Sequence, residues 1–268
     1  MTVDLTAAIE DFWIARSRGE YFPQAYFDRL TLDDAYRIQL ASIDRRVAAG
    51  ERHIGWKVGL TAKPIQEQFG FYEPVFGCVL DMQHSGHVFG ATELIAPGFE
   101  CELCVRLGQN LESNDLESNG LEDHEGNVSP QQVHAAVAAV YPSFEIIETR
   151  GDFVKQIAVA LADNAQQRSV VVGAPVPLAP LASLDQISVR VQLNGREVAT
   201  GLGAAVLGNP LNSVVWLAGK LGQYGRQLRA GDIIMTGSFV RQFPLSSGDI
   251  AVAEFSGIGR VEVGIAKV

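Results

Sequence analysis

Two glutamates, Glu100 and Glu102, stand one residue apart in a stretch where apolar residues fall at every second position: Phe99, Cys101, Leu103 and Val105. This period predicts a strand with one buried face, so both carboxylates project from the opposite face. Like charges so close repel each other, and a half-buried strand solvates them poorly. A hard divalent cation would relieve both costs, because Mg²⁺ and Mn²⁺ prefer carboxylate oxygens. A solvent-facing strand with two independent glutamates explains the same pattern.

A third carboxylate is available in a second predicted strand, residues 143–149, where Glu145 and Glu148 lie among apolar residues. A carboxylate in such surroundings is either paired or coordinating. Strand parity does not choose between these two glutamates.

Lys57 lies between Trp56 and Val58 in a segment flanked by glycines. Apolar surroundings lower the pKa of a lysine, and a nearby metal ion would lower it further, which would prepare the amine for proton transfer. Nearby glutamates would raise that pKa, so the net shift depends on whether metal is bound. The simpler interpretation is a lysine that reaches from a strand to water.

The first 50 residues form a predicted helical region, and residues 51–268 a β-rich region. Apolar residues recur at helical spacing from Leu5 to Trp13, and a second helix begins at Thr31, which with Asp34 resembles a capping box, and stops near Gly50. After residue 50, glycines become frequent and short apolar runs replace long helical stripes. Helices and strands do not alternate regularly, which argues against a doubly wound parallel sheet.

Further elements follow from local pattern. They are a polar surface loop over 112–127, a helix from Ser129-Pro130 that includes Val133, Val137 and Val140, a strand over 187–193 with a tight turn at Asn194-Gly195, a helix from Pro210 through Leu221, a strand over 232–237 and a closing hairpin over 251–268.

The composition excludes several classes of protein. At 268 residues, 47% hydrophobic and 19% charged, the chain suffices for one large domain or two smaller ones with a packed core. A net charge of −10 argues against a nucleic-acid partner, because no basic face is available to neutralise phosphates. No apolar run has the length of a membrane helix, and the N-terminus lacks a signal-peptide layout. Three cysteines make a disulfide framework improbable and fit a cytoplasmic protein.

Two short motifs resemble cofactor-binding sites but lack a feature that such sites require. Cys101 and Cys104 have the spacing of a redox or zinc pair, but a three-residue offset in a strand puts their sulfurs on opposite faces. Gly201-x-Gly203 lacks the third glycine of a dinucleotide fingerprint.

Several ordered segments together resemble the fumarylacetoacetate hydrolase superfamily, and most closely its branch of 2-oxopent-4-enoate (2-hydroxypentadienoate) hydratases and 4-oxalocrotonate decarboxylases. The segments are Gly55-Trp-Lys-Val-Gly-Leu-Thr61, Phe76-Gly with Asp81-Met82, Glu100-x-Glu102, Phe144-Glu145-Ile-Ile-Glu-Thr-Arg150, Ala162-Asp-Asn-Ala165, Gly203-Ala-Ala-Val-Leu-Gly-Asn-Pro210, Val215-Trp-Leu217, Met235-Thr-Gly-Ser238 and Gly257-Ile-Gly259.

The resemblance implies an α+β fold, a mixed β-sandwich roll preceded by a helical N-terminal region. It implies Mg²⁺ or Mn²⁺ held by Glu100, Glu102 and Glu145, and so favours Glu145 over Glu148. Lys57 matches the active-site lysine of the family. Three residues fall in segments that border the substrate pocket: Asn164, Thr236 and Gly237.

The implied activity is that of a metal-dependent hydro-lyase, which adds water to an unsaturated 2-oxo (2-hydroxydienoic) acid in the meta-cleavage catabolism of aromatic compounds. The alternative is a metal-dependent decarboxylase or C–C bond-cleaving enzyme on a related 2-oxo acid. Val75 stands where hydratases of the branch usually carry Asp and decarboxylases often carry an apolar residue, and Gln166-Gln167 replaces the usual serines. Asp81 is the nearby carboxylate that could take the place of the missing acid in catalysis.

A third interpretation is a non-catalytic partner subunit, which retention of Lys57 and the glutamates disfavours. The resemblance further implies a homo-oligomer and allows a complex with a related pathway enzyme, since members of the branch can associate. It gives no reason to expect a nucleic-acid or membrane partner.

Overall fold

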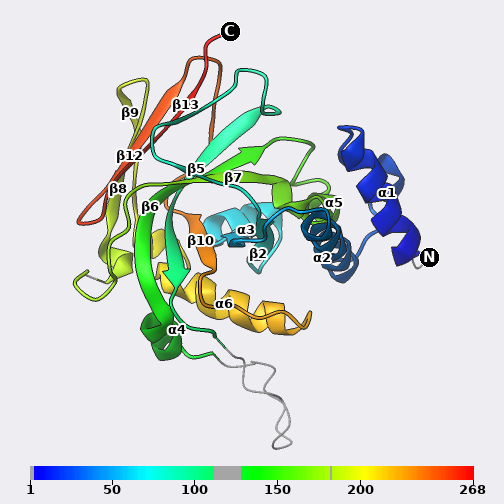
Figure 1. Ribbon diagram of the computed structural model, residues 1–268, viewed down its shortest axis with the longest axis horizontal. Coiled ribbons are helices and arrows are strands. Elements are labelled where there is room, and N and C mark those ends of the chain that lie inside the picture. The colour runs from blue at the N-terminus through cyan, green and yellow to red at the C-terminus, as the bar shows by residue number, and fades with distance from the viewer. Residues whose placement is uncertain (1–2, 112–127, 182) are drawn as a thin grey trace, which may run out of the picture.

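A computed structural model describes residues 3–111, 128–181 and 183–268 of the chain. The predicted loop over 112–127 lies outside these residues. The fold is α+β, as the resemblance implies: two mixed sheets carry helices on one flank and at one end (Figure 1).

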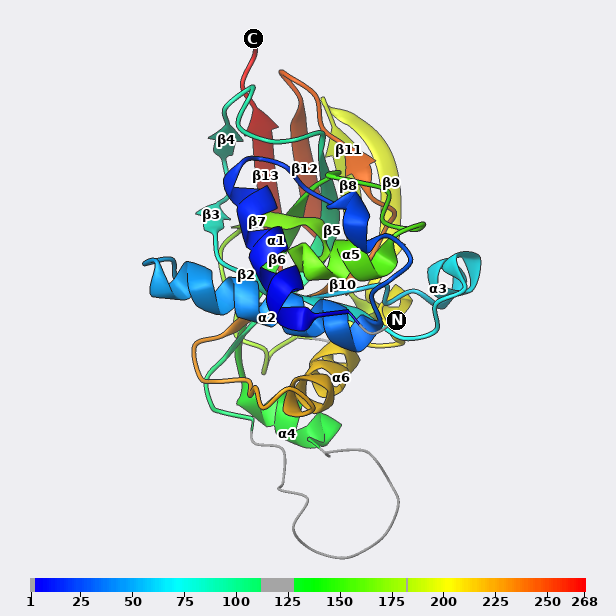
Figure 2. The same cartoon turned by 90° about the vertical axis from the view of Figure 1, so that its right-hand side faces the viewer.

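Two N-terminal helices form the flank. Helix α1 (Leu5–Ser17) begins at Asp4, whose carboxylate accepts hydrogen bonds from the backbone N–H groups of Thr6 and Ala7. Helix α2 (Leu32–Ala48) begins with the predicted capping box between Thr31 and Asp34. Helix α1 packs on α2, and α2 packs on the short helix α5 (Ile157–Ala162), as Figure 2 shows from the helical side.

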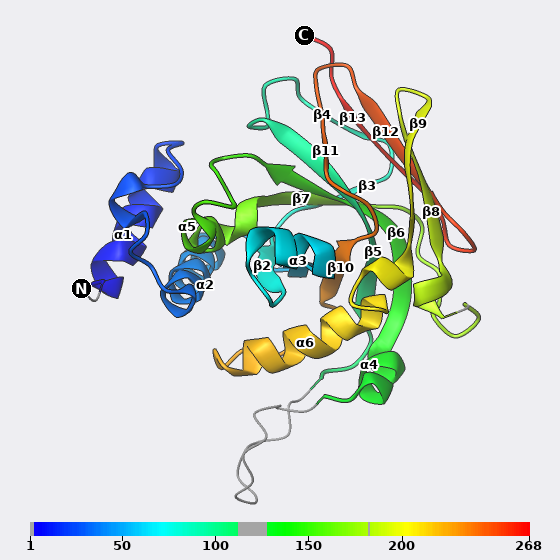
Figure 3. The same ribbon diagram turned by 180° about the vertical axis from the view of Figure 1, so that it is seen from behind.

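The larger sheet is strongly curved and mixed, with the order β2-β1-β10-β5-β6-β7-β3 (Figure 3). The pairs β1–β10 and β3–β7 are parallel and the other pairs are antiparallel. Its strands are β1 (Gly55–Gly59), β2 (Val75–Val79), β3 (Met82–His84), β5 (Pro97–Leu107), β6 (Val137–Glu148), β7 (Gln167–Val172) and β10 (Ile233–Ser238), with β11 (Phe243–Pro244) paired to the outer part of β5.

The second sheet has the order β4-β13-β12-β8-β9 and packs against the long strand β6. Its strands are β4 (His87–Phe89), β8 (Ser188–Leu193), β9 (Arg196–Leu202), β12 (Ile250–Phe255) and β13 (Gly259–Ile265). Asn194 and Gly195 join β8 to β9 with positive φ at both residues, as the predicted tight turn requires.

The remaining helices are α3 (Lys63–Phe69), α4 (Pro130–Ala136) and α6 (Pro210–Gly222), with 3-10 turns at Gln24–Tyr26, Asn164–Gln166, Leu184–Gln186 and Gly203–Ala205. Helix α6 begins at Pro210 as predicted and packs on α4 and β10. The predicted extension of the helix at 129 through Val137 and Val140 is wrong, because α4 ends at Ala136. Both valines are β-branched, and they pair with β5 as the first part of β6.

The two faces of β5 bury different clusters. Phe99 packs against the rings of Phe144 and Phe243, with ring centroids 5.1 and 5.6 Å away, in the larger core. Cys101 belongs to this core, whereas Cys104 belongs to a smaller cluster with Val170 and Met235. The two sulfurs therefore lie on opposite faces as predicted, and all three cysteines of the chain are buried and free.

Among the described residues, every helix is too short or too polar to cross a lipid bilayer.

Candidate active site and metal centre

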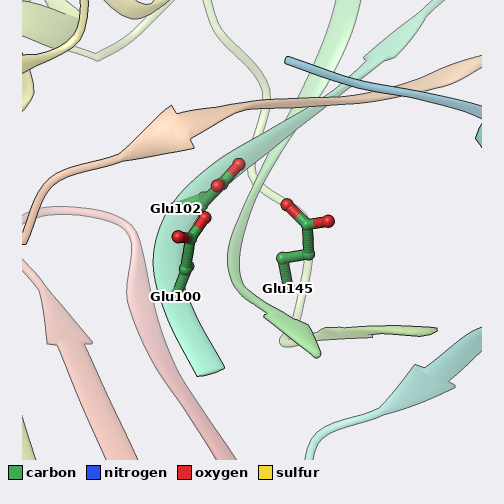
Figure 4. Close-up of side chains that lie close together, drawn as sticks. All are labelled: Glu100, Glu102 and Glu145. Atoms are coloured by element: carbon green, nitrogen blue, oxygen red, sulfur yellow. The ribbon is translucent and has the colours of Figure 1, made fainter. Parts of the chain in front are cut away.

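Strand pairing brings three carboxylates together. Glu100 on β5 lies directly opposite Glu145 on β6, and Glu102 lies two residues further along the same face of β5. One carboxylate oxygen from each residue lies within 4.8 Å of the others. Figure 4 shows the three side chains turned towards a common space between the two strands. The same-face placement of Glu100 and Glu102 follows the predicted alternation.

Two of these carboxylates are completely buried and incompletely paired. Glu102 and Glu145 have no exposed surface. Glu102 Oε1 and Glu145 Oε2 have no hydrogen-bond donor among the described residues. Because a buried, unpaired carboxylate oxygen is costly, this donor set fits a hard divalent cation that takes oxygen ligands.

The surroundings explain why these groups resist ionisation without a metal. On the same face, Cys104 follows Glu102 along β5 and Val170 lies opposite Glu145. Burial raises the pKa of Glu102 well above its usual range, and the charges of Glu145 and Glu100 raise it further. Burial raises the pKa of Glu145 to about 7, although Lys57 opposes the shift. Burial also raises the pKa of Glu100.

A β-bulge in β10 aims a backbone donor at Glu102. Met235 pairs with Cys104 and Ser238 with Glu102, so β10 has one more residue than β5 between these pairs. Within the bulge Gly237 has a φ of +113°, and its N–H donates to Glu102 Oε2 at 2.8 Å. A Cβ at Gly237 would lie 2.4 Å from Thr61 Oγ1, so only glycine fits there.

Lys57 lies in a slot that glycines leave open. Gly77 is its partner on β2, and a Cβ there would lie 3.1 Å from Lys57 Cε. Lys57 Nζ lies 3.3 Å from Glu145 Oε1, and the lysine side chain is 6% exposed. Burial lowers the pKa of Lys57, whereas the negative charges of Glu145, Glu100 and Glu102 raise it, with Glu145 contributing most. The glutamates outweigh burial, so the pKa of Lys57 is raised in the metal-free protein.

A cavity of about 660 Å³ extends from this cluster towards the surface. Lys57 and Glu100 lie at its inner end, and Val75 and Gln166 contribute to its wall. This volume is within the range of small-molecule sites.

Four of the residues that the sequence assigned to catalysis or substrate binding lie elsewhere than on the wall of this cavity. Asp81 is not brought to the site: its Oδ2 accepts from Ser169 Oγ at 2.5 Å and lies 3.6 Å from Arg168 Nη1. Asn164 is buried and clamps β2, since its side-chain amide accepts from Cys78 N at 2.7 Å and donates to Cys78 O at 2.9 Å. Thr236 Oγ1 donates to Leu103 O. The fourth, Gly237, instead supports Glu102.

Glu148, the alternative third ligand, belongs to a different network. Its Oε2 lies 2.9 Å from Arg150 Nη1, and its Oε1 accepts from Ile95 N. Arg150 also binds Asp163 Oδ2 at 2.5 Å and donates to Asp163 O. This buried network ties the end of β6 to the segment that precedes the cavity wall.

Sequence reasoning missed several residues on the cavity wall: Thr61, Thr149, Ser238, Arg241 and Gln242. Thr61 could have been predicted, because it is the last residue of the segment around Lys57 that resembles the family motif. Arg241 and Gln242 follow the bulge in an irregular segment where no periodic pattern indicates which way a side chain points.

Comparisons with known proteins agree on one family. Residues 91–266 match the model described as fumarylacetoacetate (FAA) hydrolase C-terminal. The chain is 34% identical over 239 residues to 2-keto-4-pentenoate hydratase of Paraburkholderia xenovorans (strain LB400), covering 88% of this chain and 84% of that protein. It is 34% identical over 241 residues to 2-hydroxyhexa-2,4-dienoate hydratase of Comamonas testosteroni, covering 87% and 86%.

A solved structure supports the same relationship. 4-Oxalocrotonate decarboxylase from Pseudomonas putida G7, complexed with magnesium and adipate, superposes with a TM-score of 0.84 and 29% identity, over 97% of both chains.

Proposed function

Because the chain belongs to the fumarylacetoacetate hydrolase family, we propose that it is a metal-dependent hydro-lyase that adds water to an unsaturated 2-oxo (2-hydroxydienoic) acid. Its place would be the meta-cleavage catabolism of aromatic compounds. The observation that carries the proposal is the cluster of three carboxylates beside a buried lysine at the inner end of a cavity. The similarity to two proteins named as hydratases of such acids supports it.

The cation would be Mg²⁺ or Mn²⁺, held by Glu100, Glu102 and Glu145. The magnesium in the related decarboxylase structure supports Mg²⁺. Bound there, the cation supplies a Lewis acid that stabilises the negative charge of an enolate. Gly237 N–H fixes one oxygen of Glu102, which leaves Oε1 available.

Lys57 is the group that we assign to proton movement. It lines the cavity and lies 3.3 Å from Glu145 Oε1, so its amine reaches both the carboxylate cluster and the space for the substrate. Hydration adds a hydroxyl group to one carbon of a double bond and a proton to the carbon chain. Lys57 can carry that proton or, as an ammonium ion, stabilise the enolate oxygen.

A second activity, decarboxylation of a related 2-oxo acid, is favoured by one observation. Val75 lines the cavity where hydratases of this branch usually carry Asp. Loss of carbon dioxide leaves an electron pair that becomes an enolate, and this step requires no acid to activate water. The structural similarity to a decarboxylase supports this alternative.

One incubation separates these functions. The protein is mixed with Mg²⁺ and either 2-hydroxypenta-2,4-dienoate or 4-oxalocrotonate, and products are followed by NMR. We expect a water adduct from the dienoate, whereas release of carbon dioxide from 4-oxalocrotonate alone would establish the decarboxylase. Turnover of neither acid would overturn both and leave the non-catalytic partner. Glu102→Gln, which keeps the side-chain shape, is the matched inactive control.

We also propose that the chain works as a homo-oligomer in the cytoplasm, where a related pathway enzyme could join it. Three buried, unpaired cysteines fit a reducing compartment.

A further inference from the structure

We propose that the outer end of the cavity is a second carboxylate-binding subsite, built on Arg241 and Gln242, and that the substrate is a dicarboxylic 2-oxo acid. The inference rests on the proposed function, because it takes the glutamate cluster and Lys57 as the end that binds the 2-oxo acid. The inference goes further by specifying the class of 2-oxo acid that the cavity selects.

The distance between the two ends follows from the strands beneath the cavity. Glu100 and Gly98 lie two residues apart on the same face of β5, which corresponds to about 7 Å along the strand. The side chain of Gln242 lies over Gly98, since a Cβ at Gly98 would be 2.8 Å from Gln242 Nε2. An amide donor is therefore placed outward from Glu100 by a distance that a short dicarboxylate can span.

Arg241 lies beside this amide on the cavity wall. Its Cζ is 4.0 Å from the ring centroid of Phe243, which is buried and stacks on Phe99. Phe243 pairs with Phe99 where β11 joins β5, so the ring is a fixed platform for the guanidinium group (Figure 3 shows β11 alongside β5).

The guanidinium group retains free donors. Its hydrogen bond within the described chain is a long one, 3.4 Å from Nη1 to Gln242 O, and no described carboxylate forms an ion pair with it. Arginine donors in this state suit a carboxylate, which accepts two parallel N–H bonds.

The charges of the cavity wall favour an anion at this end. Asp152 is the acidic residue of the outer wall, and its charge is compensated by Lys155 Nζ at 3.0 Å and the Lys155 N–H at 3.1 Å. Ile147 and Val240 lie on the wall as well and match the hydrocarbon chain between two carboxylates. A five-carbon monocarboxylic acid would leave Arg241 and Gln242 to water.

The kinetic test compares two substrates that differ at the distal end, 2-hydroxypenta-2,4-dienoate and 2-hydroxyhepta-2,4-dienedioate. We expect the native enzyme to favour the dicarboxylate by about 10- to 100-fold in kcat/KM, the effect of a charge-assisted hydrogen bond. Arg241→Gln should remove that preference by lowering kcat/KM for the dicarboxylate far more than for the monocarboxylate, and Arg241→Lys should retain part of the preference. Arg196→Gln, an exposed change of equal charge on β9, is the control.

A binding measurement makes the inference independent of turnover. Calorimetry with Mg²⁺ compares 2-oxoadipate with 2-oxohexanoate, which has the same chain length and one carboxylate. Tighter binding of 2-oxoadipate that Arg241→Gln abolishes supports the subsite even if no substrate is turned over, which would refute only the proposed function. Equal binding of the two acids, or equal losses for both in Arg241→Gln, would overturn the subsite.

Discussion

Lys57 and Glu145 show how one buried site balances opposing charges. Burial disfavours both the ammonium and the carboxylate, yet their separation of 3.3 Å lets each stabilise the charged form of the other. Two further glutamates tip this balance, so the pKa of Lys57 is raised while the site lacks metal. A bound cation would take over part of the compensation for the glutamates, which is why the protonation of Lys57 depends on metal occupancy.

If Lys57 moves a proton, Lys57→Met should lower kcat by about 10²–10⁴-fold, because methionine keeps the aliphatic stem and removes the amine. Steady-state kinetics at saturating Mg²⁺ measures this, with Lys63→Met on the exposed start of α3 as the control. A Lys57→Met enzyme with near-native kcat would remove Lys57 from the chemistry.

The glutamate pKa values predict how stability depends on pH in chelator-treated protein. The pKa of Glu145 is about 7 in the folded chain against an ordinary 4.5, and the pKa of Glu102 is also raised. The folded state therefore binds more protons than the unfolded state between these values, so stability is full below the ordinary pKa and falls as pH rises through the folded one.

We accordingly expect the Tm of the chelated protein to decline from about pH 5 to about pH 8 and Mg²⁺ to restore most of the loss at the upper end. Glu102→Gln should show a shallower decline, because one ionisation is removed. Identical slopes for the native protein and the variant would contradict this account.

At the level of elements, the bulge in β10 positions the site as much as the two glutamate-bearing strands do. It depends on Gly237, whose positive φ turns an N–H towards Glu102 and whose missing side chain leaves room for Thr61. A buried hydroxyl holds the preceding residue, since Ser213 Oγ donates to Thr236 O at 2.6 Å.

Gly237→Ala should therefore weaken Mg²⁺ binding and lower the free energy of unfolding by more than about 1 kcal/mol, because alanine is strained at this φ and meets Thr61. Calorimetry and thermal denaturation measure the two effects. Gly225→Ala tests the conformational cost alone, since Gly225 also has positive φ but has open space around its Cα. Metal binding as tight in Gly237→Ala as in the native protein would rule out this role of the bulge.

The sequence predicted those elements whose signals are local. Alternation around Glu100 and Glu102 gave the strand and the residues that share each face, and Thr31 with Asp34 gave the start of α2. The prediction that only one face of this strand is buried is wrong, because Glu102 and Cys104 on the other face are buried as well. The prediction that Val137 is helical was wrong. Its spacing from Val133 is helical, but pairing with β5 decides its conformation. No local pattern places Asp81 against Ser169 instead of the cavity, since these residues are 88 positions apart.

The cavity wall was the least predictable part, because its shape comes from irregular segments. Asn164, Ala165 and Gln166 all have positive φ. Only asparagine among these residue types favours that conformation, so the sequence does not indicate three such residues in a row. The placement of Arg241 depends on its contact with the ring of Phe243 and on the absence of an acidic partner among the described residues, and no local sequence pattern indicates either.

On the scale of the whole molecule, the second sheet exposes apolar side chains. Val88 on β4 and Ile250 on β12 are 57% and 49% exposed. They flank Gly264 of β13, since a Cβ there would lie 3.4 Å from Val88 and 3.8 Å from Ile250. An exposed apolar patch of this kind is typical of a contact surface.

The division of the chain at residue 50 into a helical and a β-rich region stays a prediction.

We expect a homo-oligomer in solution. Light scattering at micromolar concentration should give a mass well above the 28.9 kDa of one chain, and Val88→Glu with Ile250→Lys should lower it if this patch is the contact. A mass of one chain for the native protein would contradict the expectation.

The central claim is that the three glutamates hold a divalent cation on which catalysis depends. It is tested most directly by turnover of the 2-hydroxydienoic acid after exhaustive chelation and during titration with Mg²⁺. Activity should disappear on chelation and return with Mg²⁺ in the native enzyme, and should not return in Glu102→Gln, whose folded state is verified by its Tm. Full activity in the chelated enzyme would contradict the account.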